Sequence, residues 1–232
     1  MRPARPAAEP VPDPRLDRRF FARPARQVAR DLIGRRLVRI EPDGLRLAGR
    51  IVETEAYCDA ETPDLACHGS RNGGRPTARN RVMFGPPGHA YVYFSYGMHW
   101  LLNVVTGEPG QPNAVLLRAL APEAGLERMA LRRRDRQGRP RPRVDWCSGP
   151  ARLTQALGID GGQDGVDLCA ADAALYLEAG RPAPELARGP RIGLGRTPEP
   201  WRSMPWRYWH PSDPNVSHRG RLEAAPSRTE ND

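Results

Sequence analysis

Residues 37–57 constrain the fold more than any other part of the chain, because they predict a β-hairpin. Residues 37–40 (Leu-Val-Arg-Ile) are typical of a strand, and residues 45–57 form a second, longer one. Between them, the Glu-Pro-Asp-Gly sequence at residues 41–44 contains the residue types that favour a turn. The chain is therefore predicted to contain an antiparallel sheet.

Further strands and helices are predicted from the spacing of apolar residues. Strands are expected at residues 90–94, 99–105 and 114–120, the first two joined across Tyr96-Gly97-Met98. Helices are expected up to Gly34, over residues 123–134, and from an N-cap at Ser148 to a stop at Gly158.

These elements predict a mixed α/β (α+β) fold in a single domain. We expect a curved antiparallel β-sheet with flanking helices and a protruding β-hairpin. A chain of 232 residues suits one domain, which would span residues 17–218. Residues 1–16 and 219–232 are predicted to be disordered tails.

The basic residues of the chain favour a polyanionic partner and restrict its chemistry. The formal net charge is +9, which slightly favours nucleic acid over the alternative of an arginine-rich genome without such a partner. The sequence contains no lysine. A Schiff base through a side-chain amine is therefore excluded, and only the N-terminal amine could replace it.

We expect a protein without membrane spans, cofactor or metal. No apolar run approaches the length of a membrane-spanning helix, which predicts an intracellular protein with unpaired cysteines. Cys58, Cys67 and His68 resemble part of a zinc site but lack a fourth ligand at a usual spacing.

Glu53, Glu55 and Tyr57 alternate along one predicted strand and should share a face. Two carboxylates side by side repel each other unless they are paired or solvated. They could be a solvent-facing edge bonded to arginines, or a general base beside an aromatic wall. The pattern alone favours neither.

Tyr91, Tyr93 and Ser95 should share one face of the next hairpin, with Tyr96 at its tip. An exposed aromatic side chain at a hairpin tip is well placed to wedge between base pairs. The commoner alternative is a core tyrosine whose hairpin packs inward.

Arg118 interrupts the apolar strand predicted at residues 114–120. A guanidinium there is costly unless it meets a carboxylate, and Glu53 and Glu55 are the obvious candidates. The pair could hold a carboxylate ionised for catalysis, or it could be a buried structural ion pair.

Together these segments resemble the alkyladenine (3-methyladenine) DNA glycosylase family, as a bacterial member. The resemblance covers residues 30–159 and continues more weakly to residue 216. It is carried by residues 49–57 (GRIVETEAY), 77–84 (TARNRVMF), 91–93 with 96–98 (YVY and YGM), 116–120 (LLRAL) and 147–150 (CSGP).

The resemblance implies roles for individual residues. Glu55 matches the general base that activates water, and Arg118 matches the residue beside it. The pocket for the flipped base would be walled by Tyr57, His68 and Tyr93. Asn103 matches the pocket residue that discriminates against the amino group of guanine. Ile192 matches the residue whose backbone carbonyl helps to position the water. Tyr96, with Met98 beside it, matches the side chain that fills the gap in the stack.

The resemblance also implies a monofunctional DNA glycosylase of base excision repair. It would act as a monomer on double-stranded DNA containing damaged purines, in the cytoplasm and associated with the nucleoid. Because no lysine is present, base removal without strand cleavage is expected. Two alternatives remain: a non-catalytic nucleic-acid-binding module, and a hydrolase of a small anionic substrate with Glu55 and His68 as base and acid. The preferred lesion is not fixed.

Overall fold

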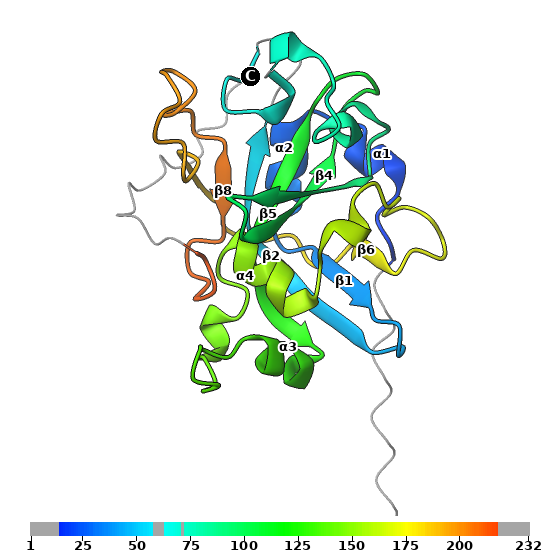
Figure 1. The fold of residues 1–232 in the computed structure, drawn as a ribbon, viewed down its shortest axis with the longest axis vertical. Coiled ribbons are helices and arrows are strands. Elements are labelled where there is room, and N and C mark those ends of the chain that lie inside the picture. The colour runs from blue at the N-terminus through cyan, green and yellow to red at the C-terminus, as the bar shows by residue number, and fades with distance from the viewer. Residues whose placement is uncertain (1–13, 58–62, 71, 218–232) are drawn as a thin grey trace, which may run out of the picture.

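The computed structural model describes residues 14–57, 63–70 and 72–217. Cys58 and most of the predicted tails lie outside these residues. Figure 1 shows strands at the centre of the molecule with helices and loops around them. The predicted single mixed α/β domain, with a curved antiparallel sheet, flanking helices and a protruding hairpin, is confirmed.

In the part of the chain that is described, the sheet has eight strands, and six of them follow the order β3-β4-β5-β2-β1-β6. β7 pairs with β8, which in turn pairs with β2. The strands are β1 (Arg36–Ile40), β2 (Arg46–Tyr57), β3 (Ala90–Ser95), β4 (His99–Val105), β5 (Ala114–Ala124), β6 (Leu175–Glu178), β7 (Ala187–Gly189) and β8 (Arg207–Trp209).

β2 is the central strand and has more partners than any other described strand. β5 runs along one side of it, while β1 pairs with its first part and β8 with Glu53–Glu55 on the other side. The ladder between β2 and β5 is irregular: its register shifts on both sides of Glu53 and skips Arg118. Such irregularities redirect side chains and occur often beside functional sites.

The helices are short, and two of their predicted starts are wrong. They are α1 (Arg18–Phe21), α2 (Ala25–Asp31), α3 (Leu126–Arg132) and α4 (Pro150–Leu157), with 3-10 turns at His68–Ser70, Asn72–Gly74, Arg81–Phe84, Arg143–Asp145 and Gly161–Gln163. The strand β5 extends to Ala124, so α3 begins only after Gly125. Gly149 replaces Ser148 as the N-cap of α4, whereas Gly158 ends that helix in a left-handed conformation as predicted.

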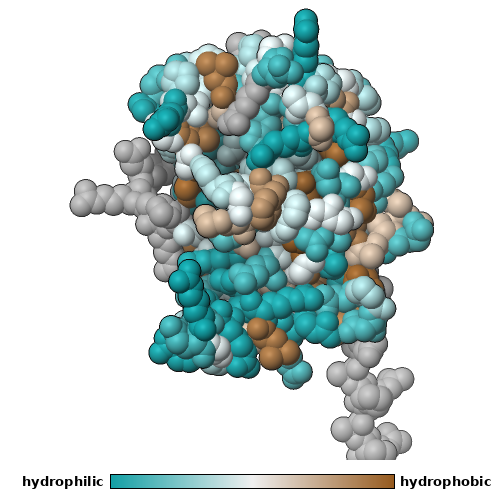
Figure 2. Space-filling view, viewed as in Figure 1, coloured by the Kyte–Doolittle hydropathy of each residue, from teal (hydrophilic) through white to brown (hydrophobic). Residues whose placement is uncertain are grey.

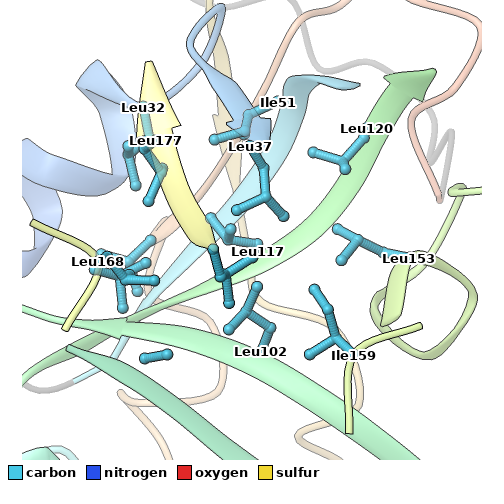
Figure 3. Packing of buried hydrophobic residues seen from close by; sticks show 14 of the residues in the cluster. Leu32, Leu37, Ile51, Leu102, Leu117, Leu120, Leu153, Ile159, Leu168 and Leu177 are labelled. Atoms are coloured by element: carbon cyan, nitrogen blue, oxygen red, sulfur yellow. The ribbon is translucent and has the colours of Figure 1, made fainter. Parts of the chain in front are cut away.

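The main core joins the sheet to α2 and α4. Leu32, the C-cap of α2, and Leu153 from α4 meet Leu37, Leu117 and Leu120 from the strands in one buried cluster (Figure 3). Full burial of such a side chain contributes roughly 1.5–3 kcal/mol. The cluster therefore fixes β2 and β5, which carry the candidate site.

The face in Figure 2 is largely hydrophilic, with scattered apolar side chains. None of the described helices has the length and apolar character that would be needed to cross a membrane. The expectation of unpaired cysteines is wrong for Cys67, which is disulfide-bonded, whereas Cys147 and Cys169 are free.

Candidate active site

A cavity of about 440 Å³ opens between the β3–β4 hairpin, the segment around His68 and the loop after Arg191. Its lining includes Tyr57, His68, Tyr93, Asn103 and Ile192, so all five predicted pocket residues are brought together. Arg118 and Tyr96 also line it. Met98 is not part of the lining and stands exposed near the hairpin tip.

Two buried carboxylates lie on β2 beside this cavity, and neither is at a solvent-facing edge. Glu53 and Glu55 are both 0% exposed. Arg118 reaches both of them: its Nε donates to Glu53 at 2.8 Å, and its Nη1 lies 3.2 Å from Glu55 Oε1. The irregular ladder at Arg118 explains how a charged residue within an apolar strand meets both carboxylates.

Glu53 is fully engaged by cations and a backbone donor. Its Oε1 accepts from Arg118 and from Arg207 Nε at 2.7 Å, and its Oε2 accepts from the Ser217 N–H at 2.7 Å. Burial alone would raise the pKa of Glu53, but the charges of the two arginines and the Ser217 N–H hold it below its ordinary value. Glu53 is therefore an ionised structural partner of Arg118.

Glu55 is not part of the described cavity lining, but it accepts hydrogen bonds from two residues that are. Its Oε1 accepts from the Ile192 N–H at 2.7 Å, and its Oε2 accepts from the Tyr57 hydroxyl at 2.8 Å. Burial opposes the charge on Arg118, but Glu55 and Glu53 outweigh it and raise the pKa of the guanidinium. A permanent cation therefore faces the Glu55 carboxylate.

Aromatic side chains form the cavity walls. The ring of His68 lies 4.6 Å from that of Tyr93 in an edge-to-face arrangement, and its Nδ1 is 2.8 Å from the Tyr91 hydroxyl. Asn103 Nδ2 donates to the Tyr91 carbonyl at 3.1 Å, which fixes the orientation of its amide. Such rings can stack on a flat heterocycle.

Tyr96 stands at the tip of the β3–β4 hairpin, where its side chain is 87% exposed. Its φ of 49° is in the left-handed region, which is costly for a residue with a side chain. Backbone conformations of this kind cluster at functional sites, and the exposure shows that the side chain does not pack in the core. The alternative of an inward-packed core tyrosine is therefore excluded.

Several residues that contribute to the site were not predicted from the sequence. Tyr91 lines the cavity, and Arg207 and Ser217 hold Glu53. The aromatic residues on both sides of Arg207 (Trp206 and Tyr208) were the available signal for a buried arginine. Among the described residues, no group of three His, Cys, Asp or Glu side chains could hold a metal ion. Cys58 lies outside them.

Comparison with known proteins identifies the family. A model of the family described as methylpurine-DNA glycosylase matches residues 19–214. A protein of Burkholderia cenocepacia (strain HI2424) is 48% identical over 212 residues, covering 90% of this chain and 94% of the relative. A protein of Methanocella arvoryzae is 46% identical over 206 residues, covering 89% and 97%. Both carry "3-methyladenine DNA glycosylase" in their names.

The chain belongs to the methylpurine-DNA glycosylase family, which confirms the resemblance seen in the sequence. It is a DNA glycosylase, an enzyme of DNA repair whose substrate is DNA.

Proposed function

We propose that the protein removes alkylated or deaminated purines, of the 3-methyladenine and hypoxanthine type, from duplex DNA. The family's description as methylpurine-DNA glycosylase and the relatives' names, which specify 3-methyladenine, support the alkylated part of this substrate class. The cavity of about 440 Å³ is in the usual size range of small-molecule sites and is walled by aromatic rings.

The target nucleotide would rotate out of the duplex to enter this cavity. Enzymes that act on a base inside a duplex pay a few kcal/mol to unstack it. Tyr96 would fill the gap left in the stack, with Met98 beside it on the same hairpin. The exposure of these two side chains, 87% and 67%, supports that role.

The observation that carries the proposal is the Glu55 carboxylate behind the cavity wall. Each carboxylate oxygen can accept about two hydrogen bonds. Ile192 N–H and Arg118 occupy Oε1, whereas Tyr57 supplies the one described donor to Oε2. An acceptor position on Oε2 therefore remains for a water molecule.

In the reaction, Glu55 would accept a proton from this water while the water oxygen forms a bond to C1′ of the sugar. The C1′–N bond breaks, and its electron pair leaves with the purine. Arg118 would place its positive charge beside the Glu55 carboxylate and help to hold the water. Hydrolysis leaves an abasic site.

The enzyme would not cut the strand. Strand cleavage by a bifunctional glycosylase needs an amine that forms a Schiff base with the sugar, and the sequence has no lysine. We therefore propose a monofunctional glycosylase of base excision repair that needs no cofactor.

Excision of hypoxanthine or 3-methyladenine from duplex oligonucleotides, followed by alkali to reveal abasic sites, tests the proposal. Glu55→Gln should retain lesion binding but lose excision in single-turnover assays. Glu178→Gln is a matched control, because Glu178 is a buried carboxylate paired with Arg46 away from the cavity.

Three outcomes would contradict parts of this proposal. Full excision by Glu55→Gln would remove Glu55 from the role of base. Lesion binding without excision by the wild-type protein would indicate a non-catalytic binding module. No affinity for lesion duplex at all would favour a hydrolase of a small anionic substrate.

A further inference from the structure

Asp64 and Arg191 form an ion pair that is completely buried, with both side chains 0% exposed. The guanidinium binds the carboxylate through two nitrogens, one at 2.5 Å and the other at 3.0 Å. The same two nitrogens also donate to the backbone carbonyls of Ala56 at 3.0 Å and Trp201 at 3.1 Å. The pair therefore connects four backbone positions that are separate in the sequence: Ala56, Asp64, Arg191 and Trp201.

Aromatic rings also hold the Arg191 guanidinium. Its central carbon lies 4.7 Å from the ring centre of Tyr57 and 4.9 Å from that of Trp206. Cation–π contacts of this kind strengthen when they are shielded from water. Together with the four hydrogen bonds, they leave the side chain little freedom to reorient.

The positions of the two residues in the chain connect this pair to the site. Arg191 directly precedes Ile192, whose N–H donates to Glu55. Asp64 lies two residues before Ala66, which lines the cavity, and also accepts from the Ala66 N–H at 3.0 Å. One member of the pair thus belongs to the loop whose Ile192 N–H binds the proposed base. The other belongs to the segment that lines the cavity at Ala66, and the ion pair connects the two.

A buried ion pair contributes little net stability, because taking two charges out of water is costly. Apolar residues of similar volume at the same positions often stabilise a fold equally well. Arginine instead offers several donors in a rigid plane, which fixes its neighbours in space. We propose that Asp64 and Arg191 are positioning residues that hold the Ile192 N–H on Glu55. The catalytic consequence rests on the proposed role of Glu55.

Selective ¹⁵N-isoleucine labelling tests the positioning directly, because the chain has five isoleucines and Ile192→Val assigns the peak. The Ile192 amide proton, bonded to a carboxylate, should resonate far downfield in the full-length protein. In Arg191→Lys, which keeps the cation but loses the planar fork, it should move upfield. Single-turnover excision should fall about 30-fold, with lesion affinity within about 3-fold, since small displacements at a reacting group are costly.

Arg132→Lys is the matched control, because Arg132 forms an ion pair with the buried Glu41 on another part of the fold. It should change neither the Ile192 peak nor excision. Asp64→Asn provides a second variant if Arg191→Lys does not fold, and it should shift the same peak.

Four results would overturn the proposal: an ordinary Ile192 shift in the wild type, an unmoved peak in a folded variant, a moved peak with unchanged excision, or unfolding of both variants. In the last case the pair would serve stability. Absence of excision by the wild type would instead refute the proposed function. The Ile192 peak positions would then still test whether Asp64 and Arg191 hold the Ile192 N–H on Glu55.

Discussion

The Tyr57 hydroxyl donates a 2.8 Å hydrogen bond to Glu55 Oε2, so a wall of the cavity is bonded to the proposed base. Burial, the charge of Glu55 and this bond together raise the pKa of Tyr57 well above its ordinary value of 10. Because the neutral form of tyrosine is the protonated one, Tyr57 remains a donor at pH values where a free tyrosine ionises. In the proposed mechanism, one side chain would therefore link binding of the base to activation of water.

Tyr57→Phe should separate these two contributions. It keeps the ring, so lesion affinity should stay within about 3-fold, while excision should slow about 10-fold through loss of one hydrogen bond to a charged group. The ratio of wild-type to variant rates should be constant between about pH 7 and 10, since Tyr57 does not ionise there. A ratio that falls to one near pH 10 would show an ordinary pKa.

Glu53→Gln should destabilise the protein in a pH-dependent way. The folded pKa of Glu53 is lowered from 4.5, so its charge stabilises the fold fully above about pH 4.5, and this contribution is lost as the pH falls through the folded pKa. At pH 7 the variant should lose about 3 kcal/mol of unfolding free energy, because Arg118 and Arg207 remain buried with less compensation. Urea denaturation at several pH values measures this.

Glu123→Gln is the control for this experiment. Glu123 pairs with Arg36 but is one-third exposed, so its loss should cost less than about 1 kcal/mol. A Glu53→Gln penalty of that small size, or one that persists unchanged at pH 3, would contradict the structural account of Glu53.

Local sequence patterns predicted the first five strands, β1 to β5, because these strands carry their own signals, but they did not predict the short strands β6, β7 and β8. The turn at residues 41–44 and the hairpin tip at Tyr96 fixed which strands are neighbours. The pattern failed at the start of α3, where β5 continues through Pro122 to Ala124. Pairing with β2 decides the end of that strand, and no local propensity records it.

The candidate site was predictable only in part. Glu55 and Arg118 stand on adjacent strands, so their encounter followed from two local patterns. Arg207 lies 154 residues from Glu53, and Arg191 lies 127 residues from Asp64. Contacts at such separations depend on how the loops close over the sheet, which a single sequence does not reveal.

Affinity for lesion duplex should fall steeply with salt. The net charge of +9 is carried by arginine, and binding to phosphates releases condensed counterions. A plot of log affinity against log salt concentration should have a slope of about −4 or steeper. Single-turnover excision at saturating enzyme should change little over the same range, since the chemical step lies inside the cavity. A flat affinity plot would argue against phosphate contacts.

Tyr96→Ala should lower the affinity for lesion duplex without destabilising the fold. Tyr96 is 87% exposed and in a left-handed conformation, so its removal should change the unfolding free energy by less than about 0.5 kcal/mol. Lesion duplex has an intact opposite strand and a stack to be filled, whereas a single-stranded lesion has neither. Affinity should therefore fall at least about 10-fold for duplex and much less for single strands.

Met98→Ala is the matched variant, because Met98 lies on the same hairpin with 67% exposure but does not line the cavity. Its loss of duplex affinity should be smaller than that of Tyr96→Ala. Fluorescence anisotropy with both substrates measures each difference. Equal losses on duplex and single-stranded lesions would count against a wedge at Tyr96, since a side chain that fills the stack has nothing to replace in a single strand.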